Sequence, residues 1–288
     1  MGYDNPALAY AIIKLVEQFS ERPYYLGKIR FNKLIYKIYR KLKDEKNIDL
    51  QLPNYWYKFG NATIMELLPD VTETVESIWE GKPREYLVVK SGVTKPELNG
   101  NRKRIDTVVR EVFKDLGYRK LNRIIEDHYS FAPYEFQQPY LKLREAIETR
   151  ANKITLDSLG IGKSNIYNLF YEMMSKFEDE EFAEILPEVL EWKSIISYLA
   201  RHYPNENKEI QTVMEPFIYL ISAALAVKTV ENAEEKINEF KAWYIKQCEL
   251  FDTFIQNYKK EFYIKYYQSD THILSFVKEI NAQVVKGL

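Results

Sequence analysis

The chain has 288 residues, of which 46% are hydrophobic and 29% are charged, and its formal net charge is −1. This composition is typical of a globular protein with one or two domains, and it excludes an intrinsically disordered chain. A single cysteine, Cys248, excludes an internal disulfide framework and an all-cysteine metal site, which favours a reducing compartment.

The N-terminal sequence does not have the pattern of a secretory signal. Asp4 stands where a signal has a basic region, and Lys14 and Glu17 interrupt the apolar run that follows. The longest apolar run, 217–227, is shorter than the ~18 residues that a membrane span requires. We therefore expect a cytoplasmic protein with no membrane partner.

Helical patterns dominate the first half. Asn5 is suited to an N-cap and Pro6 to the first helical position, and apolar residues then recur at helical spacing as far as residue 19. A second apolar stripe predicts a helix over 28–43. Further helices, or single helical turns, are predicted over 63–68, 70–80, 102–116, 121–129 and 141–151.

Two short segments interrupt these helices. Residues 52–60 begin with proline-containing sequence, end at a glycine and predict an extended piece or a turn. Residues 86–90, YLVVK, are the best strand candidate and, with a partner from residues 52–59, predict at most a small β-hairpin. The first segment also contains four aromatic side chains suited to anchoring a partner protein, namely Tyr55, Trp56, Tyr57 and Phe59.

The second half is predicted to be almost entirely helical. Residues 154–164, ITLDSLGIGKS, contain two glycines and predict a domain boundary. The chain is thus divided into an N-terminal helical domain, 1–153, and a C-terminal helical domain, 154–288. Helices are predicted over 165–177, 180–201, 207–229, 231–267 and 270–285. The expected fold class is mainly α, with two helical regions.

Charge is distributed unevenly between the two halves. Residues 1–150 carry a net charge of +5 and residues 151–288 a net charge of −6. This asymmetry indicates either a basic nucleic-acid-binding face or two halves that attract each other. Basic clusters of this kind are also common on solvated helix faces. The candidate nucleic-acid contacts are Lys33, Lys37, Arg40, Lys41, Arg102, Lys103 and Arg104.

One short motif resembles the signature of a metal-dependent nuclease. Asp70 and Glu80, the latter followed by Gly81-Lys82, correspond to its two metal-binding carboxylates and its lysine. That chemistry needs both acids on adjacent strands, whereas the intervening residues have helical spacing here. A metal nuclease therefore remains a remote alternative.

Other catalytic motifs are weaker. Residues 160–164, GIGKS, end like a phosphate-binding loop, but Asp157 stands where that loop requires glycine. The three histidines have no metal-site spacing with one another or with Cys248. His128 follows two acidic residues and is interpreted as a surface residue at a helix end. We therefore expect no enzyme activity, no metal and no cofactor.

Residues 28–68 resemble the Panacea domain of prokaryotic antitoxins and phage-associated proteins. Its lysine-bearing, Leu/Tyr-rich helix is followed by a loop and an aromatic piece, although Phe59 and Asn61 stand here where that domain has Tyr and Pro. The matching residues are Lys33, Leu34, Tyr36, Trp56, Tyr57 and Gly60. The resemblance implies a mainly helical, non-enzymatic domain that binds and neutralises a protein partner in toxin–antitoxin or phage-defence systems.

The first hypothesis for function is therefore a non-catalytic interaction subunit, antitoxin-like or accessory to a phage-defence system, with a toxin or defence effector as its partner. The aromatic segment is its expected contact, and the C-terminal helices offer a second docking surface. The alternative is a nucleic-acid-binding accessory protein that uses the basic helix faces.

Overall fold

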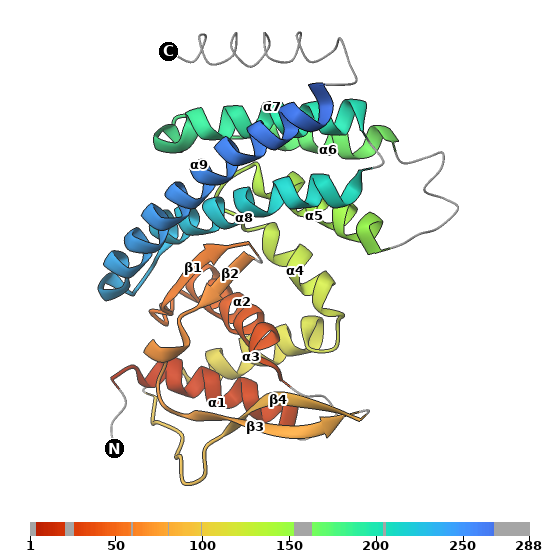
Figure 1. The fold of residues 1–288 in the computed structure, drawn as a ribbon. Helices are drawn as coiled ribbons and strands as arrows, with labels where there is room; N and C mark the ends of the chain where they lie inside the picture. The colour runs from red at the N-terminus through yellow and green to blue at the C-terminus, as the bar shows by residue number, and fades with distance from the viewer. Residues whose placement is uncertain are drawn as a thin grey trace. The chain divides into compact units, whose positions relative to one another are not determined.

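The computed structural model describes residues 4–20, 26–58, 60–79, 81–98, 100–152, 163–203 and 206–267. The chain divides into two compact units (Figure 1): unit 1 comprises Met1–His128 and Leu225–Ile237, and unit 2 comprises Tyr129–Ala224 and Asn238–Leu288. The described residues are mainly helical with two small antiparallel sheets, which confirms the predicted fold class. The boundary predicted between residues 153 and 154 lies outside the described residues and stays a prediction.

Unit 1 is built around α1 (Pro6–Ser20), a helix that is buried on nearly every side. The predicted cap is present, since Asn5 Oδ1 accepts the backbone N–H of Leu8 at 3.0 Å. Residues 8–13 are all buried, as expected for a helix that is apolar all round. The helices of this unit are α1 (Pro6–Ser20), α2 (Lys28–Lys46), α3 (Arg102–Leu116) and α4 (Leu121–Tyr129).

Two hairpins complete unit 1. Strands β1 (Asn54–Tyr57) and β2 (Gly60–Thr63) form one, and β3 (Thr72–Trp79) and β4 (Lys82–Val89) form the other. A 3₁₀ turn, η1 (Met65–Leu67), lies between them where a helical turn is predicted.

The helix predicted over 70–80 is wrong, because these residues form β3. The sequence TETVESIW is rich in β-branched residues, which suit a pleated strand, while Val75, Ile78 and Trp79 also have the spacing of one helix face. The strand predicted at 86–90 exists within β4, and its partner is β3 rather than a segment of 52–59. Gly81, with a φ of 74°, permits the tight turn between them.

Unit 2 packs helices around an aromatic core. Trp192 stacks on Phe217 with 3.8 Å between ring centroids, and its indole N–H donates to the carbonyl of Val213 at 2.8 Å. Its elements are α5 (Gln137–Asn152), α6 (Lys163–Ser175), η3 (Ala183–Ile185), α7 (Leu186–His202), most of α8 (Asn207–Thr229) and nearly all of α9 (Ile237–Tyr267). The end of α8 from residue 225 onward, η4 (Glu234–Lys236) and the first residue of α9 belong to unit 1. The helix predicted over 270–285 lies outside the described residues.

Among the described helices, α8 is long and apolar enough to cross a membrane by length and composition alone. Over Lys208–Thr229, 61% of the relevant window is nevertheless buried inside the protein. Core helices of soluble proteins share both properties.

Candidate functional site

The predicted aromatic contact forms strand β1 and directs its rings to two sides. Trp56 is 4% exposed, and its ring packs edge-on against Tyr36 with 6.2 Å between centroids. Tyr55 and Tyr57 lie on the other side, half-buried, with 5.9 Å between their rings. Phe59 lies outside the described residues. Trp56 is therefore a core residue of unit 1, and the two tyrosines are the described members of this set with exposed surface.

The lysine of the predicted basic face on α2 is part of the core instead. Lys33 is 1% exposed, and its ammonium donates to the backbone carbonyl of Asn61 in β2. Its Nζ also lies 5.8 Å from the ring centroid of Tyr57. Because this charge is enclosed by the β1–β2 hairpin, Lys33 is not placed to contact a phosphate from solvent, and its prediction as a nucleic-acid contact is wrong for this structure.

The other selected cations of α2 are engaged by carboxylates of the same unit. Lys37 pairs with Asp127 at 2.8 Å. Arg40 pairs with Asp44 at 3.1 Å, one turn further along α2. Lys41 pairs with Glu111 of α3 at 2.5 Å, and this hydrogen bond raises the pKa of Lys41. The face of α2 is thus largely neutralised within unit 1.

The three predicted nucleic-acid contacts at the start of α3 differ in whether they contact other side chains. Arg102 donates through Nε to the hydroxyl of Tyr10 at 3.1 Å and lies over that ring. Lys103 and Arg104 are exposed, and the described part of the chain provides no ion pair for either. These two residues remain available for an external anion.

Buried polar side chains connect α2, α4 and the β1–β2 hairpin. Asn61 Nδ2 donates to Asn54 Oδ1 at 2.6 Å, and Asn54 Nδ2 donates to the carbonyl of Leu52 at 2.7 Å. His128 of α4 contacts the carbonyl of Lys33 through Nε2 at 2.7 Å. The residues that resemble a Panacea helix and aromatic piece therefore meet in space, held by hydrogen bonds that no local sequence pattern indicates.

His128 is a core residue, so its interpretation as a surface residue is wrong. It is fully buried, and it follows Ile124 and Ile125 at helical spacing on the apolar face of α4. A carbonyl can only accept, so Nε2 carries the proton and donates to Lys33. Burial, and then the charge of Lys33, hold the pKa of His128 well below its usual value. The ring is therefore neutral at pH 7.

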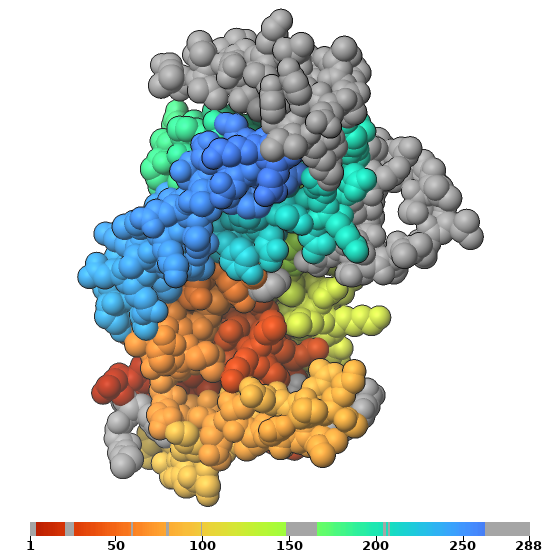
Figure 2. All heavy atoms as spheres, viewed as in Figure 1, coloured from red at the N-terminus to blue at the C-terminus, as the bar shows by residue number. Residues whose placement is uncertain are grey.

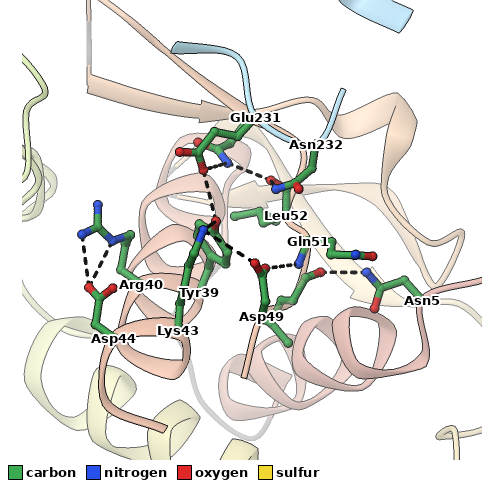
Figure 3. A network of polar contacts seen from close by, with 12 residues as sticks. Asn5, Tyr39, Arg40, Lys43, Asp44, Asp49, Gln51, Leu52, Glu231 and Asn232 are labelled. Atoms are coloured by element: carbon green, nitrogen blue, oxygen red, sulfur yellow. Dashed lines mark hydrogen bonds and ion pairs between the residues drawn. The ribbon is translucent and has the colours of Figure 1, made fainter. Parts of the chain in front are cut away.

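A segment from the C-terminal half completes this unit. Residues 225–237 return to unit 1, and Glu231 exchanges two backbone hydrogen bonds with Asn54, of 3.1 and 2.9 Å. The Glu231 carboxylate accepts from the hydroxyl of Tyr39 at 3.1 Å, and Asn232 donates to the carbonyl of Leu52 at 3.0 Å (Figure 3). The segment is thus fixed to β1 as a short additional bridge.

A cleft of about 390 Å³ adjoins this network. Gln51 and Asn232 line it, and both have the left-handed backbone that non-glycine residues rarely adopt, with φ of 48° and 54°. Asn5, at another wall, donates to the carbonyl of Leu50 at 2.7 Å (Figure 3). The side-chain amides of Asn5 and Asn232 are thus occupied by backbone carbonyls rather than directed at a ligand.

The β3–β4 hairpin is the exposed element of unit 1 that sequence patterns missed. Its base is buried at Val71 and Leu87, and the N–H of Leu87 donates to the carbonyl of Leu26 at 3.0 Å. Beyond this base, residues 82–85 are exposed, and Ile78 is 77% exposed. Figure 2 shows these strands, in gold, at the surface of the unit.

This hairpin also separates the two acids of the nuclease-like motif. Asp70 precedes β3 and pairs with Lys90. Glu80 follows β3 and lies outside the described residues. The eight residues of β3 span about 26 Å at roughly 3.3 Å per residue. The helix predicted over 70–80 is wrong, so it does not argue against the motif. Strand β3 nevertheless separates the two acids along the chain.

The described residues of the chain hold no group of three His, Cys, Asp or Glu side chains that could bind a metal ion. Cys248 lies half-buried on α9 beside Tyr244, and burial raises the pKa of its thiol. Most of the GIGKS motif and all of His272 lie outside the described residues.

Comparison with known proteins finds no matching family model, no similar curated protein and no similar solved structure.

Proposed function

We propose that this protein is a non-catalytic subunit that binds a partner protein, and that the distal half of the β3–β4 hairpin is the contact surface. The observation that carries the proposal is the apolar side chain of Ile78, which is 77% exposed near the end of a hairpin whose residues 82–85 are exposed as well.

An isolated two-stranded hairpin is marginally stable in water, and an exposed apolar residue on it adds an aggregation hazard. Burial of Ile78 against a partner removes that apolar surface from water and stabilises both the complex and the hairpin. Among the described residues β3 and β4 form a two-stranded sheet, and an exposed edge of such a sheet suits the addition of a strand from another protein.

Charge on the hairpin specifies the kind of partner. Glu76 and Glu85 lie directly opposite each other in the ladder, an arrangement of like charges that destabilises a sheet. Lys28 pairs with Glu85 at 3.0 Å and offsets part of this repulsion. A partner that presents an apolar pocket beside lysine or arginine side chains fits Ile78 and Glu76 together.

The resemblance to the Panacea domain supports the same class of function. It implies a toxin or a defence effector as the partner and the cytoplasm of a prokaryotic cell as the setting. The matched residues Lys33, Tyr36 and Trp56 converge on one core, so residues 28–68 fold as a unit that can support the adjoining hairpin.

The test compares tagged wild-type protein with Ile78→Ser and Glu76→Lys in quantitative pull-downs from the native host. The captured partner is then purified and titrated against each form. Ile78→Ser removes the apolar side chain that the complex would bury, and it is expected to weaken binding by about 2 kcal/mol, roughly 30-fold. Glu76→Lys is expected to weaken it further for a basic partner.

A matched control is Tyr171→Ser, which removes a side chain that is 65% exposed on α6 of unit 2. It should leave the affinity unchanged. If the partner binds both hairpin variants with wild-type affinity, the hairpin is not the contact. Loss of binding in Tyr55→Ala instead would return the site to the aromatic strand.

A further inference from the structure

One side of α3 carries a line of three cations with a threonine between them. Lys103, Thr107, Arg110 and Lys114 recur at intervals of four, three and four residues, so they project from one narrow face of the helix. All four are exposed. From the first to the last the line is about 16.5 Å long, at roughly 1.5 Å per residue.

The carboxylates of α3 flank this line and are engaged by other side chains. Asp106 accepts from the hydroxyl of Tyr10 at 2.9 Å. Glu111 pairs with Lys41 of α2, and Asp115 pairs with Arg119 at 2.5 Å. In the part of the chain that the structure describes, the three cations of the line make no ion pair and are exposed, and Arg110 Nε donates to the backbone carbonyl of Asp106 at 3.2 Å.

The start of α3 adds to this positive potential. Its first turn consists of Arg102, Lys103 and Arg104 with no acidic residue, although the helix dipole already makes an N-terminus positive. Asn101, at the N-cap, forms no side-chain hydrogen bond to the amides of that turn. This arrangement costs helix stability in the free protein and is relieved when an anion binds.

An aromatic side chain lies just beyond the other end. Tyr118 follows the C-terminal Gly117 and is 43% exposed. Its ring contacts Phe113 in an edge-on arrangement with 5.1 Å between centroids. Cations along a backbone track and a partly exposed ring at its end are the two components of sites for single-stranded nucleic acid.

We propose that the exposed face of α3 binds single-stranded nucleic acid, with Lys103, Arg110 and Lys114 contacting backbone phosphates and Tyr118 stacking on a base. The nucleic-acid surface is thereby placed on α3 rather than on α2, whose selected cations are buried or paired. This function is separate from the hairpin and does not depend on a partner protein binding there.

The experiment measures the fluorescence anisotropy of labelled 20-nucleotide single strands of DNA and of RNA with the full chain. Three neutralised phosphates give a salt slope of about −2, so affinity should fall roughly 18-fold between 50 and 200 mM salt. The triple variant Lys103→Glu, Arg110→Glu, Lys114→Glu should abolish this binding. Tyr118→Ala should weaken it by at least about fivefold.

The control carries the same change in net charge at another surface. Lys241, Lys246 and Lys260 are exposed on α9, and their reversal to Glu should leave affinity within about twofold of wild type when corrected for a general charge effect. Circular dichroism establishes that each variant is folded. An α3 variant that is folded and still binds refutes the proposal, as does equal loss of binding in both triple variants.

Two further ligands decide the chemistry. A duplex of the same sequence should bind more weakly than the single strand, because paired bases cannot stack on Tyr118. Poly-glutamate of equal charge should compete poorly. If poly-glutamate binds as well as the single strand, the face recognises acidic chains in general and the nucleic-acid proposal is wrong. Comparison of the affinities for single-stranded DNA and single-stranded RNA identifies which nucleic acid the face prefers.

Discussion

Lowering the pH should destabilise unit 1 through His128. Its pKa in the folded protein lies well below its usual value because the ring is buried beside Lys33. A group with a depressed folded pKa contributes stability above its unfolded pKa, near 6.5, and loses that contribution as the pH falls below this value. Between pH 6.5 and pH 5 the loss is at most about 2 kcal/mol, at roughly 1.36 kcal/mol per pH unit.

The physical origin of this loss is specific to the ring. Protonation would add an N–H at Nδ1, a buried atom for which the described residues provide no hydrogen-bond partner. It would also place a second positive charge near the ammonium of Lys33. The folded protein therefore excludes the charged form, whereas the unfolded chain accepts the proton.

The assay is urea unfolding followed by circular dichroism at pH 7.5 and pH 5.0, for wild type and for His128→Gln. Glutamine retains an N–H donor for the Lys33 carbonyl and does not titrate. Carboxylates titrate equally in both proteins, so the difference between the two pH responses isolates His128. Wild type should lose more stability than the variant, by up to about 2 kcal/mol. Equal losses, within about 0.5 kcal/mol, would refute the placement of this ring in the core.

Two pairs of substitutions test the packing of β1. Trp56→Ala should reduce the free energy of unfolding by about 3–5 kcal/mol because its ring is buried against Tyr36, while Tyr55→Ala, on the half-buried side, should cost roughly 1 kcal/mol in the same urea experiment. Thr229→Val should cost about 1–3 kcal/mol because it leaves the backbone N–H of Trp56 without its acceptor at 2.8 Å, and Thr229→Ser should restore most of this stability. Equal effects of the two aromatic truncations, or of Val and Ser at residue 229, would contradict this description of the strand.

Local chemistry was sufficient to predict most of the helices. Asn5 caps α1 through its own side chain, and Gly117 follows the last residue of α3 at a position where a Cβ would lie 2.5 Å from the carbonyl of Phe113. Such signals act within one or two turns of the chain, so they can be read without knowledge of any distant residue. The apolar stripes of α2 and α3 are predictable for the same reason.

The β3–β4 hairpin could not be predicted in this way. Residues 72–79 fit a strand and a helix face alike, and the pairing of Val75 with Tyr86 decides between them. Because the pattern of residues 70–80 predicts a helix and the strand at 86–90 is assigned a partner from 52–59, sequence patterns do not indicate the exposed hairpin or Ile78 as an interaction surface.

The sequence by itself determined a mainly helical protein with two basic clusters, because helix periodicity and residue charge are properties of neighbouring residues. Only the tertiary structure decided which of those charges face solvent. Lys33 is enclosed by a hairpin 28 residues away and Lys37 meets a carboxylate 90 residues away, whereas Lys103 and Arg110 are left exposed. It also brought Glu231 to Asn54, 177 residues apart. Contacts over such separations depend on how the whole unit buries its apolar surface, and no local pattern encodes them.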